Sequence, residues 1–345
     1  MPRPVAVRDV LALDVGGANI KAADGRGWTH AEPFAMWRER DRLAAMLERL
    51  MGTAAPSRVV ATMTGEIADC FVDRREGVSH IVEATVAACV SCDLPPPEIY
   101  RLDGRLVPPA AALADPLAVA AGNWHAVARL AGSFVPGGRA FMVDVGSTTT
   151  DIVPLVAGRP TPLAVDDPGR MLSGELVYTG VERTPLPAIV RCLPHGDRRR
   201  PVAGERFAEA RDAWLLLGGL PENAASLDTA DGEPFTREAA RARIARAVLV
   251  EPGTLSPDQA ERAAVAVAAA QARQVARAMT RVARGCGWIP EAIVYSGHGE
   301  PLARMAVERL GWRMATVSLP TILGPAVARS APAHALALVA LGELT

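Results

Sequence analysis

The chain has 345 residues, half of them hydrophobic, and its 37 basic and 38 acidic residues give a formal net charge of -1. A chain of this length usually divides into two lobes, and with only 4% aromatic residues we expect cores of Ala, Val and Leu. The balanced charge gives no indication of a nucleic-acid or anionic-membrane partner.

The two ends of the chain bear on its location. Residues Met1 to Pro4 lack the apolar stretch of a signal peptide. The most apolar predicted helix, from Pro325 to Leu341, is too short to span a bilayer. We therefore expect a cytoplasmic protein without a membrane partner, and leave open whether it forms a homo-oligomer.

The five cysteines, an odd number, disfavour a disulfide framework. Cys89 and Cys92 form a C-x-x-C pair, but Cys70 and His80 are the only further ligands nearby and their spacing fits no standard zinc site. A metal site at Cys89 and Cys92 is thus left open, and we interpret the pair as small buried residues on a helix that begins near Ser79.

The predicted elements alternate between strands and helices. Apolar runs predict strands at 9–14, 18–23, 58–63, 140–144, 149–156, 291–295 and 313–318. Helical spacing predicts helices at 40–50, 79–90, 116–130, 203–217, 236–250, 256–284 and 302–310, with a last helix from 325. The segment 185–201 is predicted to be irregular, and the Arg198–Arg200 run to be a solvated turn.

Two segments far apart in the chain align without a gap. Leu11–Gly16 reads LALDVG and Phe141–Gly146 reads FMVDVG. Each places an aspartate, Asp14 or Asp144, at the end of a strand, before a glycine turn and a returning strand. A repeat of this kind predicts two similar halves rather than a short-period array.

The two turns suit a polyphosphate. An aspartate at such a strand end can hold Mg²⁺, directly or through water, so Asp14 and Asp144 are candidate metal ligands and catalytic residues. Glycines let backbone N–H groups approach phosphate oxygens, and hydroxyls add hydrogen bonds. The candidate phosphate-binding residues are Gly16, Gly17, Asn19, Lys21, Gly146, Ser147, Thr148 and Thr149. One D-V-G turn often merely ends a strand, but two in register indicate a clamp for a di- or triphosphate.

A third glycine turn, Ser296-Gly297-His298-Gly299, follows the predicted strand 291–295. An ordinary strand–helix connection would look the same. If it belongs with the other two turns, Ser296, Gly297 and Gly299 form a loop on the nucleotide side of the site.

These three segments, in this order, resemble the two phosphate loops and the nucleotide-side loop of the acetate/sugar kinase, heat-shock chaperone and actin superfamily. The resemblance extends over essentially the whole chain. It implies an α/β, two-lobed actin-like (ribonuclease H-like) ATPase fold with a central cleft. We expect the first lobe to comprise 1–135 plus 325–345 and the second 136–324.

Within that superfamily the chain is similar to hydantoinase/oxoprolinase-like proteins, and to a subgroup linked to tetrahydromethanopterin-dependent one-carbon transfer. The segments that carry this likeness are Thr62–Phe71, Gly174–Val181 and Thr229–Gly232. Archaeal members resemble the aryl-ether-forming synthase of methanofuran biosynthesis. The resemblance implies a transferase that joins an aminomethylfuran-methyl diphosphate to the phenol of a glutamyltyramine or tyrosine-type acceptor and releases diphosphate.

Residues for the rest of this reaction are less clearly marked. A phenol has a pKa of about 10, so a base would help at neutral pH, and Glu66 and Asp69 are candidates. Glu66 could instead cap a helix. Lys21 could face phosphate, although a strand lysine more often faces solvent. Glu175 and Asp231 could bind an ammonium group or lie on surface loops.

Three alternatives stay open. An ATP-dependent small-molecule kinase or ATPase would share the fold, so ATP binding is undecided. Mg²⁺ is the cofactor expected from the two aspartates. A hydantoinase-like hydrolase is a second rival, although such chains are usually longer. An actin-like or chaperone-like module is disfavoured, because the chain has no spare length for a peptide-binding domain.

Overall fold

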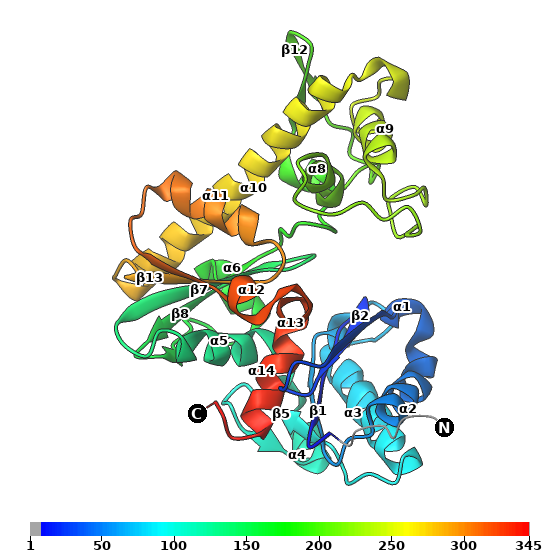
Figure 1. Cartoon of the computed structure of the whole chain (residues 1–345), viewed down its shortest axis with the longest axis vertical. Helices are drawn as coiled ribbons and strands as arrows, with labels where there is room; N and C mark the ends of the chain where they lie inside the picture. Colours follow the sequence, from blue (N-terminus) through cyan, green and yellow to red (C-terminus); the bar gives the residue numbers. More distant parts are fainter. Residues whose placement is uncertain (1–7, 345) are drawn as a thin grey trace.

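The computed structural model describes residues 8–344, so the expectation for Met1 to Pro4 lies outside the described residues. Figure 1 shows an elongated molecule in which one sheet lies beside helices at its lower end, a second sheet lies in the middle, and a mainly helical part extends beyond. Two six-stranded sheets and one two-stranded sheet account for the strands of this part of the chain.

The first sheet has the strand order β3-β2-β1-β4-β5-β6. Its central strands β1 and β4 are parallel, and every residue of both is buried, as expected of strands covered on both faces. α2 and α3 pack together, and α14 packs on β1 and β4. The elements are β1 (Leu11–Val15), β2 (Asn19–Ala23), β3 (Thr29–Pro33), β4 (Val59–Met63), β5 (Glu98–Tyr100), β6 (Leu106–Val107), α1 (Met36–Glu39), η1 (Arg40–Arg42), α2 (Leu43–Ala54), η2 (Gly65–Ile67), α3 (Arg74–Ser91), α4 (Pro109–Ala114), η3 (Pro116–Ala118) and α14 (Ala331–Ala340).

The second sheet repeats this plan with the order β10-β8-β7-β13-β14, and β9 pairs with β8. β7 and β8 form the second hairpin, and β13 joins β7 in parallel. α10 and α11 pack together beside this sheet, while α5 also contacts it. The elements are α5 (Asn123–Ser133), β7 (Arg139–Val145), β8 (Thr150–Val156), β9 (Arg159–Pro160), α6 (Asp167–Ser173), β10 (Leu176–Val177), α10 (Pro257–Cys286), β13 (Ala292–Ser296), α11 (Glu300–Leu310), β14 (Ala315–Ser318), α12 (Leu319–Leu323) and α13 (Pro325–Arg329).

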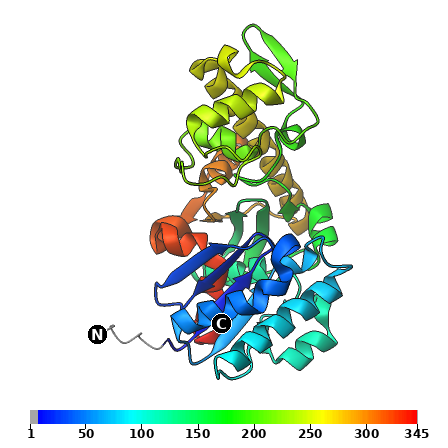
Figure 2. The same ribbon diagram turned by 90° about the vertical axis from the view of Figure 1, so that its right-hand side faces the viewer.

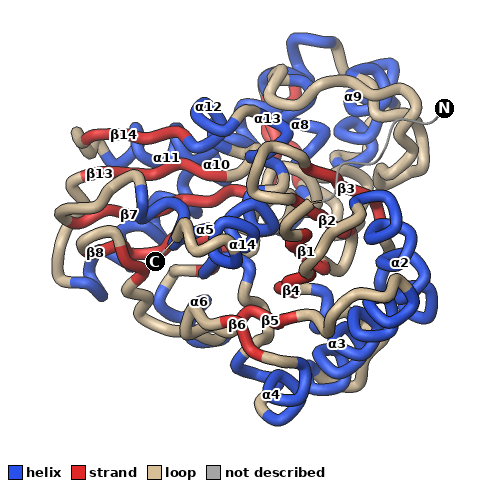
Figure 3. The backbone as a smooth tube through the Cα atoms, turned by 60° about the horizontal axis from the view of Figure 1, so that its bottom comes forward, coloured by secondary structure: helices blue, strands red, loops and turns tan. Residues whose placement is uncertain are grey.

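α5 and α14 lie between the two sheets, as Figure 3 shows, and bury a core of their own. This core joins Ala12 of the first sheet to Met142 of the second through side chains such as Trp124 and Leu336. Both hairpins are thereby held facing the same space. Because these helices share one core with both sheets, the limits 1–135 plus 325–345 and 136–324 stay a prediction for the two lobes.

The long helix α10 begins where its end signals place it. Ser256 is the N-cap, and its hydroxyl accepts from the backbone N–H of Gln259. In return, the side-chain oxygen of Gln259 accepts from the backbone N–H of Ser256. Gly287 ends the helix in the left-handed conformation. The prediction of one helix over 256–284 is confirmed.

The far half of α10 carries the mainly helical part, which Figure 2 shows at the top of the molecule. It consists of α7 (Leu186–Ile189), β11 (Cys192–His195), β12 (Arg198–Pro201), α8 (Ala210–Leu216), α9 (Arg237–Ala247) and η4 (Pro252–Thr254). The prediction that 185–201 is irregular is therefore wrong, because this segment contains α7, β11 and β12. The arginine run is a strand of the β11–β12 hairpin rather than a turn, although its side chains are exposed as expected.

Other element limits also differ from the predictions. The helix predicted at 116–130 is interrupted at Ala121, which has a φ of 49°, so that α5 begins only at Asn123. The last helix is broken at Ser330, because Pro332 sits in the first turn of α14. α3 begins at Arg74 rather than near Ser79, since the Asp73 carboxylate caps it.

The cysteines are all free, and among residues 8–344 no three His, Cys, Asp or Glu side chains are grouped to hold a metal ion. Cys89 is buried on α3 beside Met51, whereas Cys92 is half-buried at the helix end. The small-residue interpretation is confirmed for Cys89. Over the same residues the structure contains no helix long and apolar enough to cross a membrane.

Candidate functional site

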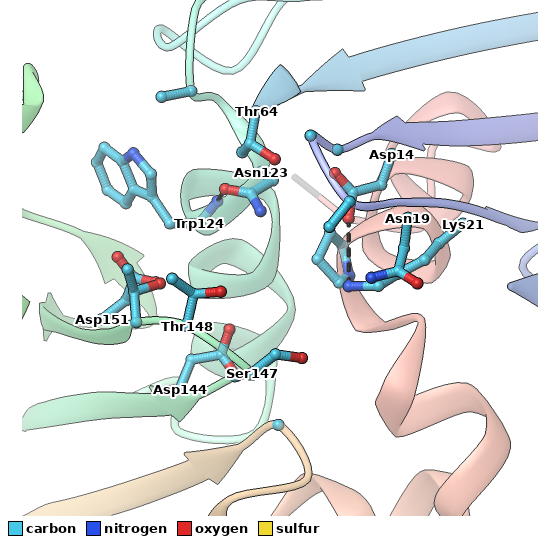
Figure 4. Close-up of a pocket in the computed structure, with 18 of the residues that line it drawn as sticks. Asp14, Asn19, Lys21, Thr64, Asn123, Trp124, Asp144, Ser147, Thr148 and Asp151 are labelled. Carbon is cyan, nitrogen blue, oxygen red and sulfur yellow. Dashed lines mark hydrogen bonds and ion pairs between the residues drawn. The ribbon is translucent and has the colours of Figure 1, made fainter. Parts of the chain in front are cut away.

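Both glycine hairpins open into one cleft of about 380 Å³. Figure 4 shows Asp14, Asn19 and Lys21 on one side of it and Asp144, Ser147 and Thr148 on the other. The residues predicted for the metal, the phosphates and the nucleotide side, together with Glu66, all line the cleft except Ser296 and Gly299. The structure thus brings these predicted residues together in one cleft: Asp14, Gly16, Gly17, Asn19, Lys21, Glu66, Asp144, Gly146, Ser147, Thr148, Thr149 and Gly297.

Ser296 and Gly299 lie behind the cleft instead. Ser296 is fully buried beside Asp144 in the parallel pairing of β13 with β7. Gly299 packs so closely that an added Cβ would lie 2.3 Å from a side-chain carbon of Val145. Both residues therefore support the second hairpin rather than line the cleft.

The first hairpin pairs its aspartate with a lysine. Asp14 and Lys21 are directly opposite in the register of β1 and β2, and Lys21 Nζ lies 3.7 Å from Asp14 Oδ2. Lys21 lines the cleft rather than facing open solvent. Burial raises the pKa of Asp14 against the effect of Lys21, and its Oδ1 has no protein partner. An oxygen in this state is available to an ion or a substrate.

The second hairpin carries a different pair. Asp144 stands opposite Asp151 in the register of β7 and β8. Burial, reinforced by the negative charge of Asp151, raises the pKa of Asp144 to about 6. The turn between them is closed by the Gly146 N–H, which donates to the carbonyl of Thr149 at 2.9 Å.

Asp151 is a cleft residue that the sequence reasoning missed. It takes the place that Lys21 has in the first hairpin, so extending the gapless alignment to the second strand would have found it. Arg170, which is buried, donates to Asp151 Oδ1 at 2.9 Å and lies 3.9 Å from the ring centre of Trp124. A cation from α6 thus partly offsets the second carboxylate.

Gly180 holds the second turn from behind. The Val181 N–H donates to the Gly146 carbonyl at 3.1 Å. A Cβ at Gly180 would lie 2.5 Å from the carbonyl carbon of Ser147 and 2.6 Å from the Gly146 oxygen, a contact that real structures do not show. Any side chain at Gly180 must displace the Gly146–Thr149 turn.

We therefore expect Gly180→Ala to lower the free energy of unfolding by about 1–3 kcal/mol, because backbone atoms must move to admit the methyl group. Inorganic diphosphate, our probe for the turn, should bind at least about tenfold more weakly. Urea denaturation and titration calorimetry measure the two effects. Gly204→Ala is the control, since nothing lies within 4 Å of a Cβ there. Unchanged diphosphate binding in Gly180→Ala would contradict this role of the turn.

Glu66 combines burial with free oxygens. It lies in η2 just beyond β4, is 1% exposed, and neither carboxylate oxygen has a hydrogen-bond partner in the protein. Burial raises its pKa to about 7, outweighing the opposing effects of its own backbone N–H and of the nearby guanidinium of Arg74. It does not cap a helix, so the capping alternative is not supported. Asp69, the other candidate base, is exposed and does not line the cleft.

The two acids proposed for an ammonium group lie elsewhere. Glu175 is fully buried and accepts from the backbone N–H groups of Leu163 and Ala164 at 2.8 and 3.0 Å, so it is neither a cleft ligand nor a surface residue. Asp231 accepts from Arg243 and Arg246 in the mainly helical part. The structure does not support ammonium binding by either residue, because both carboxylates already accept from protein donors. Asp231 lies on an exposed loop, as the alternative for it predicted.

His298, on the third glycine turn, lines the cleft and was not among the predicted site residues. Its Nε2 lies 2.9 Å from Glu182 Oε1, off the line of a hydrogen bond, so the contact is an ion pair when the ring is protonated. Burial would raise the pKa of Glu182, but His298, Arg329 and Arg211 outweigh it and hold that pKa at about 2. Glu182 therefore stays charged.

The mouth of the cleft is partly apolar. Trp37 and Tyr178 line it and keep 39% and 53% of their surface exposed. The guanidinium of Arg183 lies 5.5 Å from the Trp37 ring centre. These rings offer planar faces to an aromatic ligand. The sequence did not reveal them because they come from α1 and from the loop after β10.

The family follows from a match across most of the chain. Residues 58–341 match the family model Hydantoinase/oxoprolinase. The chain belongs to this family.

Two relatives are more specific. The chain is 29% identical over 253 residues, 72% of this chain and 74% of the other, to the (4-{4-[2-(gamma-L-glutamylamino)ethyl]phenoxymethyl}furan-2-yl)methanamine synthase of Methanocaldococcus jannaschii. The synthase of the same name from Methanococcus vannielii is 28% identical over 205 residues, which are 59% of this chain and 91% of that one.

One solved structure has a similar fold. A nucleotide-free structure of acetone carboxylase superposes with a TM-score of 0.57 at 11% identity, over 95% of this chain and 70% of that chain. The predicted two-lobed actin-like α/β fold is confirmed.

Proposed function

We propose that this chain is a transferase of methanofuran or methylofuran biosynthesis, acting in the cytoplasm on the furan cofactor of tetrahydromethanopterin-linked one-carbon metabolism. It joins an aminomethylfuran-methyl diphosphate to the phenol of a glutamyltyramine or tyrosine-type acceptor and releases diphosphate. The observation that carries the proposal is one cleft that places two phosphate-type turns, around Gly16 and Gly146, beside an unpaired buried carboxyl, Glu66. The likeness to the methanogen synthases supplies the substrates.

The two turns hold the diphosphate. Gly17 and Gly146 leave room for phosphate oxygens against the backbone, since a Cβ at these positions would meet no atom closer than 3.9 and 3.7 Å. Ser147 and Thr148 line the cleft with hydroxyl donors. Lys21 adds positive charge from the opposite side. Such fixed donors lower the energy of the charge that gathers on a departing diphosphate.

The residues present also fit Mg²⁺. Asp14 Oδ1 is buried without a partner, and Asp144 lines the facing side of the cleft. Residues 8–344 contain no group of three His, Cys, Asp or Glu side chains that could hold a metal ion. Mg²⁺ does not require one, because it usually keeps several waters and binds one or two carboxylates plus substrate phosphates. Asp144 and Asp14 would hold the ion, which neutralises charge on the leaving group when bound.

Glu66 takes the proton of the phenol. A carboxyl with a pKa of about 7 is half deprotonated at neutral pH and is a stronger base than an ordinary glutamate. The phenolic oxygen then forms a bond to the furfuryl carbon as the carbon–oxygen bond to diphosphate breaks, and that electron pair leaves with the diphosphate. Trp37 and Tyr178 would pack against the two aromatic substrates and exclude water.

The reaction can be tested directly. With the furan diphosphate, a phenolic acceptor and Mg²⁺ but no nucleotide, we expect ether and diphosphate to form in equal amounts. Mass spectrometry and a diphosphate assay follow the two products, and separate incubations with glutamyltyramine, tyramine and tyrosine rank the acceptors. Omitting the acceptor is the control for simple hydrolysis of the donor.

A small-molecule kinase or a hydantoinase-like hydrolase is the alternative, favoured by the family and by a third turn at Gly297 that lines the same cleft. Turnover of ATP with a small alcohol or acid, without any ether from the furan diphosphate, would replace the proposed transferase by the kinase. Ring opening of a hydantoin under the same conditions would favour the hydrolase.

A further inference from the structure

His298 is the histidine that lines the cleft, and the backbone fixes it beside the second phosphate-type turn. The N–H of Gly299 donates to the Val145 carbonyl at 3.0 Å, directly before that turn. An added Cβ at Gly297 would lie 2.6 Å from Asp144 Oδ1, so the loop passes close to the candidate metal ligand. The imidazole is thus anchored next to the place proposed for diphosphate.

Glu182 reaches the same turn from its other side. Its backbone N–H donates to the Ser147 carbonyl at 3.0 Å, and its carboxylate meets His298 at 2.9 Å. Arg329 and Arg211 lie 3.4 and 3.7 Å from that carboxylate, so two further cations hold it in place. A fixed anion 2.9 Å from the imidazole orients the ring.

We propose that His298 is a further catalytic residue, which contacts the leaving diphosphate and protonates its departing oxygen, and that Glu182 positions it. This rests on the proposed function. As the furfuryl carbon–oxygen bond breaks, its electron pair stays on the diphosphate oxygen, which takes the proton from the imidazolium. The phenol proton goes to Glu66, so one proton is taken up and one is released within a turnover.

The first test uses binding alone. Titration calorimetry with inorganic diphosphate and Mg²⁺ should show at least about tenfold weaker binding to His298→Gln, because one charge-assisted contact is lost. His195→Gln is the matched control, since His195 contacts Arg200 in the β11–β12 hairpin and does not line the cleft. Equal diphosphate affinity in His298→Gln and the unmodified chain would overturn the contact.

The second test isolates the proton. His298→Gln should form ether about a hundredfold more slowly, in the range of general acid catalysis. A donor whose diphosphate bridging oxygen is replaced by CF₂ has a less basic leaving group, so most of this loss should disappear with it. An equal loss with both donors would show that His298 binds diphosphate without protonating it, and would overturn that step.

The third test asks whether Glu182 acts through His298. Glu182→Gln should slow ether formation less than His298→Gln does, and the double variant should be no slower than His298→Gln. Additive losses would mean that Glu182 serves the fold independently. If the unmodified chain forms no ether at all, the proposed reaction is wrong, and the diphosphate titration then decides alone whether His298 contacts diphosphate.

Discussion

Replacing Asp144 by Asn is expected to slow ether formation at least about a hundredfold while the chain stays folded. Stabilising charge on a leaving group commonly contributes a few kcal/mol to lowering a barrier. Asp144 lines the cleft at the end of β7, and Asn keeps its shape without the charge that attracts Mg²⁺. The measurements are the initial rate at saturating substrates and the Mg²⁺ concentration that gives half of it.

The pKa of Asp144 makes the metal dependence a second readout. Because that pKa is raised to about 6, protons compete with Mg²⁺ as the pH falls through 6, and the Mg²⁺ requirement of the unmodified chain should rise. Asp144→Asn should lose this pH dependence. Asp197→Asn, in the exposed β11–β12 turn, is the control. A near-normal rate for Asp144→Asn, with the usual Mg²⁺ requirement, would mean that Asp144 only ends a strand.

Replacing Glu66 by Gln is expected to lower the rate about a hundredfold or more, since general base catalysis typically contributes that much. The unmodified chain should gain activity as the pH rises through about 7, because only the deprotonated carboxylate accepts the phenol proton. Glu66→Gln should show no such rise. Asp69→Asn separates the two candidate bases, and a loss there equal to that of Glu66→Gln would move the base to Asp69.

The same carboxyl predicts a change in stability that does not depend on catalysis. The folded pKa is about 7 and the ordinary value is 4.5, so between these pH values the unfolded chain binds fewer protons than the folded one. Glu66 therefore lowers the free energy of unfolding as the pH rises from 4.5 to about 7, by roughly 3 kcal/mol, and adds no change above that. Other carboxyls add slopes of their own, so the difference between the unmodified chain and Glu66→Gln isolates this one. Denaturant unfolding measured from pH 4 to 8 tests it, and identical slopes would contradict the burial of a free carboxyl.

Two side-chain contacts cross the cleft between the elements around the two hairpins. Arg74 of α3 forms an ion pair with Asp167 of α6, so a contact joins the elements around the two hairpins across the cleft. Arg183 reaches over Trp37 in the same way. These contacts connect the two sides of the cleft.

The sequence by itself determined the parts of the protein that depend on neighbouring residues. An aspartate, a glycine turn and a returning strand form a hairpin from local hydrogen bonds, so Asp14 and Asp144 could be placed without a structure. The start of α10 could also be predicted, because the side chains of Ser256 and Gln259 each accept a hydrogen bond from the other's backbone N–H within one turn. The repeat of the hairpin then predicted two similar halves and a shared cleft.

Only the tertiary structure decided how distant residues meet. Whether Lys21 faces the cleft, whether Glu175 is buried, and which carboxylate holds His298 all depend on side chains brought together from separate elements. Glu175 was misplaced for this reason, since its partners at Leu163 and Ala164 lie in a loop with no local signal. The pairing of His298 with Glu182 is of the same kind. The packing of distant elements decides such contacts. Burial removes water from a charged side chain, so its partners must be other groups of the protein.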